Sequence, residues 1–473
     1  MWEWGGDRVK GAEGVREFQD FRRIADAVAG EIARGRLRPG DRLPPQRLFA
    51  RRRRIAPSTA SRVYAELVRR GLVVGEVGRG TFVRAVPEPT GRALTEPAAT
   101  PAEVNLELNY PFAPGQSELL SASLGPLLRP DVFASATGTA AAAGTPGARV
   151  GAAALLAHGG WRPAPEQVLF TGTARQGIAG ALAALVPPGG RVGVEALTYP
   201  VVKEIAARLH VTLVPLAMDE RGMRPGAVAE AHRSAPLSAL YVQPTLHNPT
   251  GTTMPDGRRR ELAAVVRDLD LPVVEDRIWS FLGPEAPAPF AAYAPERTHV
   301  VDGLSKRLAP GLSVGFLVTP GADDERTAAA LRSGGWTAAR FALEAATRWL
   351  ADGTAGRLAA AKRADAAARH RLVDTALAGH DIRTDPHAYY VWWRLPAPWR
   401  GETFTAAAAA RGIAVTPGAA FTVGATTAPD LVRVGLASPP QDVLAAALRT
   451  LAEVAADGPA HHTDATLHPG TPV

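Results

Sequence analysis

Three polar motifs, each placed after an apolar run, constrain this chain more than any other feature. Asn248-Pro249-Thr250-Gly251 follows the first run, Asp276 closes the second, and Ser305-Lys306 follows the third. Sheets in α/β proteins place their chemistry just beyond the ends of strands. The pattern therefore predicts an α/β fold in which these side chains form one site.

Lys306 is informative because lysine is scarce in this chain. Among 53 lysines and arginines there are only four lysines: Lys10, Lys203, Lys306 and Lys362. An arginine stays protonated, whereas a buried lysine can lose its proton and form a Schiff base. A solvent-exposed lysine remains the alternative for Lys306 when it is taken by itself.

The order and spacing of the motifs carry a resemblance. Asp276 lies 28 residues after Asn248, and Lys306 lies 30 residues after Asp276. This pattern resembles the class I aminotransferase family (fold type I), whose cofactor is pyridoxal 5′-phosphate (PLP), over about residues 105–457. The resemblance implies that Lys306 holds PLP as the internal aldimine. It also implies that Asp276 keeps the pyridinium nitrogen protonated and that Asn248 donates to the ring 3-oxygen. An ordinary turn and a solvated strand-end charge are the alternatives.

A strand, a turn and a helix near residue 170 predict a phosphate site. The apolar run 168–170 leads into small residues that open a helix through Leu185. Backbone amides at a helix N-terminus are suited to binding phosphate. In the resembled family this turn holds the PLP phosphate, which implies contacts from Gly172, Thr173 and Ala174.

Three further positions match parts of the family's site. Tyr199 matches an aromatic residue that stacks on the pyridine ring, with a core or rim tyrosine as the alternative. Arg433 matches the arginine that binds the substrate α-carboxylate through two parallel hydrogen bonds; an arginine on a surface strand is the alternative. Asn109-Tyr110 resembles an arm that lies near the partner's active site.

Two positions depart from the family pattern. Trp279 stands where a tyrosine usually bonds the ring oxygen, and an indole can donate but cannot accept. It therefore either donates to the 3-oxygen or packs. Ser313 stands where an arginine usually grips the phosphate, and we expect Ser305 or Arg307 to compensate in part.

The first 84 residues differ from the rest in charge and in pattern. They carry 19 Lys/Arg and 10 Asp/Glu, a net charge of +9, against 34 and 36, a net charge of −2, in the remainder. Apolar residues recur at helical spacing from Phe21 to Ile32, and Pro44-Pro45 and Pro57-Ser58 open two more predicted helices. Residues 72–83 predict a glycine-tipped β-hairpin. This basic module indicates a winged helix-turn-helix with a polyanion partner; a protein-interaction module is the alternative.

The module resembles the GntR family of bacterial regulators over about residues 18–84. The matching features are Gly40 to Pro44, Tyr64 to Leu67 and Gly78 to Val83. The resemblance implies double-stranded DNA as the partner, contacted by Arg47, Ser58, Thr59, Arg62, Arg79, Gly80 and Thr81. Arg53 and Arg54 depart from the family's apolar residue and glycine, and we expect Arg54 to strain the turn between the second and third helices.

Composition limits the classes of protein that remain. The absence of cysteine excludes disulfides, thiolate nucleophiles and Cys-ligated zinc, and no metal site is expected. No apolar run approaches the roughly 20 residues needed to span a bilayer, and the N-terminus lacks a signal-peptide pattern. We therefore expect a cytoplasmic protein. Its expected parts are a flexible N-terminus (1–17), the head (18–84), a linker (85–104), a body (105–457, with a large part of about 150–325 and a small part of about 326–457) and a disordered tail (458–473).

A GntR-type head joined to an aminotransferase-like body resembles the MocR/GabR group of transcription regulators. The expected fold is an α+β winged helix followed by an α/β PLP-dependent transferase fold, with a mixed, mostly parallel sheet and a small α+β part. The hypothesis is that an amino compound displaces Lys306 from PLP, is anchored by Arg433 and changes DNA affinity. A homodimer would place two heads on one operator. An active aminotransferase carrying a DNA-binding head is the alternative, and a scaffold that has lost PLP is a third possibility.

Overall fold

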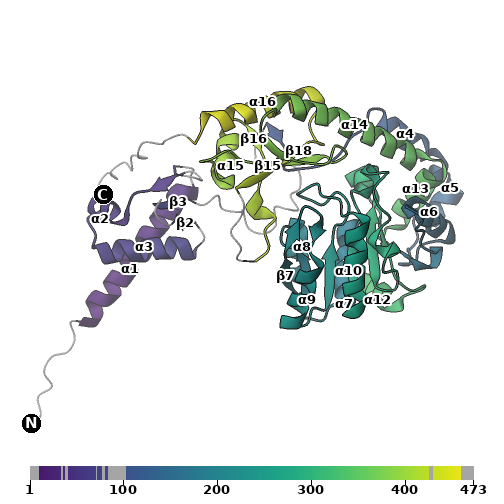
Figure 1. The fold of residues 1–473 in the computed structure, drawn as a ribbon, viewed down its shortest axis with the longest axis horizontal. Helices are drawn as coiled ribbons and strands as arrows, with labels where there is room; N and C mark the ends of the chain where they lie inside the picture. The colour runs from purple at the N-terminus through teal and green to yellow at the C-terminus, as the bar shows by residue number, and fades with distance from the viewer. Residues whose placement is uncertain are drawn as a thin grey trace, which may run out of the picture. The chain divides into compact units, whose positions relative to one another are not determined.

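Figure 1 shows the computed structural model of the protein. The structure describes residues 10–33, 36–37, 41–70, 72–76, 80–83, 103–424 and 430–459. They fall into two compact units. The first contains the head together with Pro396–Arg411 and the chain from Glu453 onward, and the second contains the body residues Ala93–Leu395 and Gly412–Ala452.

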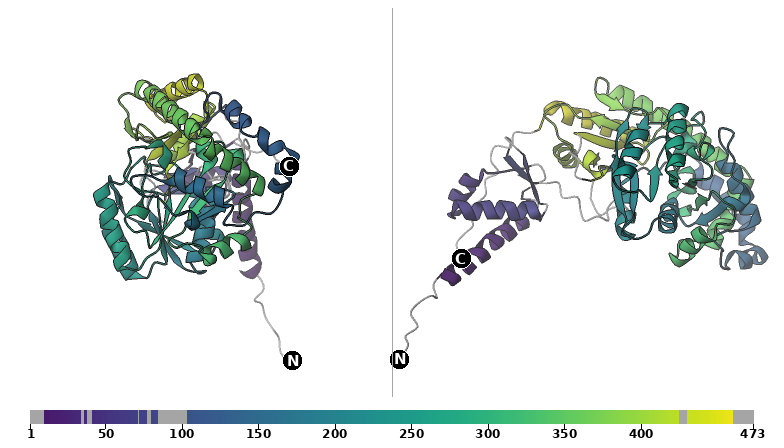
Figure 2. Two further views of the ribbon diagram at one scale, coloured as in Figure 1. Left: turned by 90° about the vertical axis from the view of Figure 1, so that its right-hand side faces the viewer. Right: turned by 60° about the horizontal axis from the view of Figure 1, so that its bottom comes forward.

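The head is a three-helix domain with a small sheet, seen from two further sides in Figure 2. Its elements are α1 (Lys10–Ala33), β1 (Arg42–Leu43), α2 (Gln46–Arg53), α3 (Pro57–Arg69), β2 (Val73–Glu76) and β3 (Gly80–Val83). The sheet order is β1-β3-β2, and both pairings are antiparallel. The helices bury a shared apolar core that includes Phe21, Val28, Phe49, Val63 and Leu67. The predicted winged helix-turn-helix is confirmed.

The first helix begins earlier than the sequence analysis expected. Residues 1–17 were expected to be flexible, but α1 starts at Lys10. The stretch from Gly11 to Glu17 contains no proline, and its charged residues are good helix formers. Residues 1–9 lie outside the described part of the chain, as do residue 84 of the expected head, 85–102 of the expected linker and 460–473 of the expected tail.

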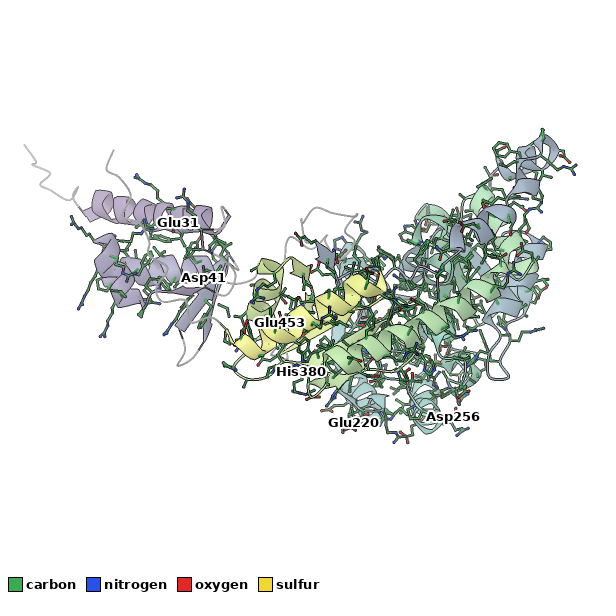
Figure 3. All side chains as sticks on the ribbon, turned by 90° about the horizontal axis from the view of Figure 1, so that it is seen from above. Glu31, Asp41, Glu220, Asp256, His380 and Glu453 are labelled. Atoms are coloured by element: carbon green, nitrogen blue, oxygen red, sulfur yellow. The ribbon has the colours of Figure 1, made fainter. Side chains whose placement is uncertain are left out.

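Arg54 adopts the left-handed backbone conformation that the sequence led us to expect. It caps α2 with φ 52° and ψ 45°, a region that favours glycine. Its neighbour Arg53 keeps its head group at the surface, where it pairs with Glu31 on α1 at 3.3 Å. Figure 3 labels Glu31 on this helix. The strain is therefore local to Arg54.

Replacing Arg54 by glycine should stabilise the head. Removing the left-handed penalty is expected to raise the free energy of unfolding of the head by about 1 kcal/mol. Backbone amide hydrogen exchange in α2 and α3 of the full-length protein measures the effect, and exchange should slow. The control is Arg51→Gly inside α2, which should cost about 1 kcal/mol and speed exchange. Equal exchange in the Arg54→Gly variant and the parent would contradict the expectation.

The body is built on a seven-stranded sheet of order β5-β13-β12-β11-β10-β6-β7. The strands are β5 (Val168–Thr171), β6 (Arg191–Glu195), β7 (Thr212–Leu216), β10 (Ala239–Val242), β11 (Val273–Asp276), β12 (Thr298–Gly303) and β13 (Gly315–Val318). Strand β13 runs antiparallel to both of its neighbours, and the other pairings are parallel. The predicted mixed, mostly parallel sheet is confirmed.

Helices cover both faces of this sheet, which explains why its central strands are buried at every position. Alternate residues of a strand point to opposite faces. Tyr241 and Val274 pack towards α7 (Ala174–Leu185), α8 (Pro200–Arg208) and α12 (Glu325–Ser333). On the other face, Leu240 and Val273 pack towards α9 (Pro225–Ser234) and α10 (Asp256–Asp268), while α6 (Pro146–Leu156) and α13 (Arg340–Ala351) cover the β5 end.

A second, four-stranded antiparallel sheet belongs to the C-terminal part of the body. Its order is β14-β15-β18-β17, with β14 (Asp381–Arg383), β15 (Tyr390–Arg394), β17 (Thr416–Pro417) and β18 (Leu431–Gly435). The long helix α14 (Thr354–Ala376) precedes it, and α16 (Gln441–Asp457) follows it. Strand β4 (Val104–Asn105) pairs with β16 (Ile413–Ala414), so the start of the body is tied to this part.

The remaining elements are short. They are α4 (Gln116–Ala122), α5 (Pro130–Ala136), α11 (Leu304–Arg307), α15 (Gly401–Ala410), the hairpin β8 (Met218–Asp219) and β9 (Gly222–Met223), and six 3-10 helices: η2 (Gly125–Leu128), η3 (Pro165–Gln167), η4 (Ser280–Leu282), η5 (Phe290–Ala292), η6 (Pro310–Leu312) and η7 (Gly418–Ala420). Among the helices that the structure describes, none has the length and apolar character to cross a bilayer.

Candidate functional site

The three sequence motifs meet at one edge of the large sheet. Asp276 ends β11, Asn248 lies in the loop after β10, and Lys306 lies on α11 directly after β12. Strand β11 is parallel to both β10 and β12, so the carboxyl ends of the three strands share an edge. Each motif is thus positioned by a strand whose neighbours are fixed in register.

Asp276 is a buried carboxylate held by neutral donors. Its side chain is 2 % exposed. The hydroxyl of Tyr241 donates to it at 2.7 Å, Nε2 of Gln243 at 2.9 Å and the amide of Ile278 at 3.0 Å. Burial raises the pKa of Asp276, and these donors oppose that rise. A cationic ring N–H would supply the charge partner that the three neutral donors cannot.

Gln243 connects Asp276 to the rest of the motif. Its side-chain oxygen accepts from the backbone amide of Asn248 at 3.3 Å, while its backbone amide donates to Oε1 of Glu195 at 3.0 Å. One side chain therefore fixes both the strand-end carboxylate and the Asn248 turn. The sequence analysis missed Gln243, because nothing in the chain order shows that it faces Asp276.

Lys306 presents an amine to this edge. Its Nζ donates to the carbonyl of Asn109 at 2.5 Å and lies over the rings of Tyr110 and Trp279 at 4.2 and 5.1 Å. Burial is the main reason that the pKa of Lys306 lies well below its usual value. The charges of nearby cations, Arg175, Arg433 and Lys362, lower it further. An unprotonated amine is the form that reacts with an aldehyde.

Lys362 supports the backbone of this lysine. It is fully buried on α14, and its Nζ donates to the carbonyl of Lys306 at 3.1 Å and to that of Leu308 at 2.5 Å. Burial lowers the pKa of Lys362 to about 7. The sequence analysis did not assign Lys362 to the site. The signal that could have identified it is the rarity of lysine in this chain.

Arg433 is a buried cation on β18. It donates to Oδ1 of Asn248 at 3.4 Å, to Oγ1 of Thr416 at 3.1 Å and to the carbonyl of Glu107. Its Nε is buried and has no hydrogen-bond partner in the described structure. Burial lowers the pKa of Arg433 to about 10, so it stays charged at neutral pH. An orphaned N–H on a buried guanidinium fits the expected carboxylate ligand.

The predicted phosphate turn is present at the start of α7. Thr173 caps the helix, and its Oγ1 accepts from the amide of Gln176 at 3.2 Å. The close approach of Gly315 holds the turn, since a Cβ there would lie 2.2 Å from Oγ1 of Thr171. The amide of Gly172 already donates to the carbonyl of Trp336 at 3.1 Å. The Gly172 amide is therefore already engaged, contrary to the expectation that it is offered to phosphate, whereas Thr173 and Ala174 remain the predicted phosphate contacts.

The remaining predicted site residues differ in their surroundings. Tyr199 lies just before α8, and its hydroxyl accepts from Nε of Arg175 at 3.0 Å. Trp279 is buried and packs on Tyr390 at 5.8 Å between ring centroids. Ser305 lies beside Lys306 on α11 and is partly buried. Trp279 was expected either to donate to the 3-oxygen or to pack, and its contact with Tyr390 favours packing.

Arg307 does not have the position that the sequence analysis expected. Its guanidinium donates to the buried carboxylate of Asp302 at 2.7 Å and lies over Phe281. A buried ion pair of this kind cannot release its cation without leaving a carboxylate uncompensated. The expectation that Arg307 compensates for Ser313 is therefore wrong. The hydroxyl of Ser313 is buried and has no partner among the described atoms.

Together these observations show that the residues fit PLP. An amine whose pKa is lowered by burial, a carboxylate held by neutral donors among the described residues, and an unsatisfied guanidinium N–H face one sheet edge. Asn109 and Tyr110, expected near a partner's site, lie beside Lys306 of the same chain.

Glu195 is a second buried carboxyl group near Asp276. Its Oε2 has no hydrogen-bond partner in the described structure. Burial raises the pKa of Glu195 to about 8, and the charge of Asp276 adds to that rise. The group is therefore protonated in the folded protein at neutral pH.

This proton makes stability depend on pH. The usual pKa of 4.5 applies in the unfolded chain, so between pH 4.5 and about 8 only the folded state holds the proton. Stability should then fall as pH rises through this window, by at most about 1.4 kcal/mol per pH unit, and level off above it. The Glu195→Gln variant should remove most of that slope in urea unfolding at several pH values. The control is exposed Glu220 (Figure 3), whose change to Gln should leave the profile intact. An unchanged slope in Glu195→Gln would refute the assignment.

The predicted DNA-contacting residues divide into four groups, of which buried Thr59 forms one by itself. Arg47, Ser58 and Arg62 are exposed on α2 and α3. Gly80 and Thr81 lie on β3 and are partly buried, and Arg79 lies outside the described residues.

Thr59 was expected to contact DNA, but the structure buries it. It is 5 % exposed, in line with Val63 one turn later. Residues four apart in a helix lie on the same face, which here is the core face.

Comparisons with known proteins match the body and the head to two different families. The model of aminotransferase class I and II matches residues 133–451, and the model of bacterial regulatory proteins of the gntR family matches residues 21–83. The chain is 28 % identical to an uncharacterized HTH-type transcriptional regulator, YdeF of Bacillus subtilis, over 89 % of this chain and 90 % of that protein. It is 28 % identical to the HTH-type transcriptional regulator TauR of Rhodobacter capsulatus, over 63 % of this chain and 67 % of that one.

A solved structure resembles the body in fold. An archaeal alanine:glyoxylate aminotransferase superposes with a TM-score of 0.68 at 20 % identity and covers 78 % of this chain and 94 % of its own. At that identity the likeness supports the fold alone.

Proposed function

Since the chain belongs to the aminotransferase class I and II family and carries a GntR-type domain ahead of it, we propose that it is a PLP-binding transcription regulator. In this proposal the head binds double-stranded DNA, and the body senses a small amino compound. The observation that carries it is that Lys306, whose pKa burial lowers well below its usual value, and the buried Asp276 lie at one sheet edge, in the same chain as a basic winged head. The regulators YdeF, similar over 89 % of this chain, and TauR, similar over 63 % of it, support it.

The family is PLP-dependent, and PLP supplies an aldehyde and an electron sink when bound. Lys306 would offer the amine for covalent attachment, and the rings of Tyr110 and Trp279 lie against it. Asp276 holds a proton on the ring nitrogen, and Asn248, fixed by Gln243, faces the same edge. Tyr199 is the proposed stacking residue, with Thr173, Ala174 and Ser305 near the phosphate.

Arg433 gives the site its preference for a carboxylate. Its partners, Asn248 and Thr416, belong to different parts of the body. An effector carboxylate bound there would compete with these bonds and so favour a different arrangement of the large and small parts. DNA affinity changes only by the difference in effector affinity between the two arrangements. Such coupling typically amounts to about 5- to 150-fold.

We further propose that the protein acts as a homodimer in the cytoplasm, where its DNA partner lies. Two heads joined through their bodies would bind a two-half-site operator with a raised effective concentration. On the exposed face of the head, Arg47, Ser58 and Arg62, with Gly80 and Thr81 of the hairpin, are the proposed DNA contacts. The basic charge of the head favours phosphate contacts.

The test measures ligand binding by the body and DNA binding by the head in the same protein. An absorbance titration of the PLP-loaded protein with amino compounds should find one that shifts the visible band, and promoter footprinting should show altered DNA binding over the same concentrations.

A second candidate, an active aminotransferase tethered to DNA, is favoured by the retention of Lys306, Asp276 and Arg433 together. Steady-state turnover with an amino donor and a 2-oxo acid, without any change in DNA binding, would establish it instead. The buried packing of Trp279 and the loss of charge at Ser313 argue against an optimised enzyme.

A further inference from the structure

The phosphate of PLP needs a cation that Ser313 does not provide. A phosphate monoester carries a charge of about −1.5 to −2 at neutral pH, and charge-assisted hydrogen bonds bind it best. A serine hydroxyl can donate one hydrogen bond but brings no charge. If the body binds PLP as proposed, another basic side chain must stand near the start of α7.

The other cations close to Lys306 already have hydrogen-bond partners, although the Nε atoms of Arg307 and Arg433 have none in the described structure. Arg307 is paired with Asp302 at 2.7 Å inside the core. Lys362 donates to two backbone carbonyls behind α11. Arg433 is bonded to Thr416 and Asn248 on the side of the second sheet.

Arg175 has the position that the others lack. It is the second residue of α7 and follows the phosphate turn directly. Its Nε donates to the hydroxyl of Tyr199 at 3.0 Å, and the phenols of Tyr199 and Tyr110 raise its pKa against the opposing effect of burial. Tyr110 also contacts Lys306, with 4.2 Å between its ring centroid and Nζ. Arg175 therefore shares one cluster with the proposed stacking residue and the proposed PLP lysine.

The helix itself gives no reason for an arginine at this position. A cation in the first turn of a helix opposes the helix dipole, at a cost of about 0.3–1 kcal/mol. Its charge reaches Glu204 on α8, but the hydrogen-bonding partner is a neutral phenol. An anion bound at the turn would reverse this cost, because the dipole and the guanidinium would then act on it together.

We propose that Arg175 is the residue that pairs with the phosphate of PLP in this protein. The positive charge is thereby supplied from the start of α7 instead of from position 313. The proposal rests on the proposed function, because it requires that the body binds PLP.

The test compares two aldehydes that differ only in the phosphate. Dissociation constants of the apo-protein for PLP and for pyridoxal are measured by absorbance, for the full-length chain and for Arg175→Gln. The substitution should weaken PLP binding about 10- to 100-fold and leave pyridoxal binding within about twofold. The matched control is Arg208→Gln, an exposed arginine on α8, which should change neither constant.

The possible outcomes separate this inference from the proposed function. If wild-type protein binds neither aldehyde, both fail. If wild-type protein prefers PLP over pyridoxal and Arg175→Gln shows the same preference, only the assignment of Arg175 fails. A variant that binds PLP and pyridoxal less well by the same factor, as a folding defect would cause, also keeps the parent's preference. That outcome therefore counts against the assignment of Arg175 as well.

Discussion

Replacing Lys306 by alanine is expected to abolish covalent PLP binding and the visible absorption band that comes with it. Burial and the nearby cations lower the pKa of Lys306 well below its usual value, and the amine lies at the same sheet edge as Asp276. Alanine has no nucleophile to replace it. The visible spectrum of the purified, PLP-saturated protein is the measurement, and borohydride reduction followed by peptide mass spectrometry should find the attachment at position 306 in the parent only.

Lys203 provides a matched control for this experiment. It is also partly buried, its pKa is also lowered by burial, and its Nζ donates to the carbonyl of Thr422 at 3.2 Å. The Lys203→Ala variant should keep the visible band, because its amine is engaged with the 420–422 loop. A band that survives in Lys306→Ala, or label found on Lys203, would refute the assignment of the site.

Replacing Arg433 by methionine is expected to weaken the binding of amino acids by about 100-fold or more, since losing one partner of a buried charge pair costs about 3–5 kcal/mol. Methionine fills similar space on β18 without offering the two N–H groups that a carboxylate needs. The midpoint of the spectral titration with the effector measures the loss. The same midpoint should shift in a DNA-binding titration, because the two are coupled.

Two controls separate carboxylate recognition from general damage. An amine without a carboxylate should bind the Arg433→Met variant as well as it binds the parent. The Arg433→Lys variant keeps the charge but loses the planar fork, so it should recover only part of the affinity. Equal loss for both kinds of amine would show that Arg433 supports the fold of the site and does not read the ligand.

The local sequence determined which segments form helices and strands. It also determined which site residues follow which strand. Short apolar runs made buried strands, as at Ala239–Val242 in β10 and Val300-Val301 within β12. Parallel neighbours share an edge, so motifs placed after such runs, with Asp276 and Lys306 among them, had to come together. In the head, helical spacing and turn chemistry predicted the winged fold and the strained backbone at Arg54.

The side-chain partners were decided only by the tertiary structure. Lys306 bonds Asn109, which lies 197 residues away in sequence, and Lys362 reaches back 56 residues to support it. Arg307 and Arg175 are both arginines one residue from a site motif. Yet one is locked against Asp302 and the other faces Tyr199. Periodicity gives the face of a helix but not what is packed against it, and the charge, burial and pairing of these groups depend on that packing.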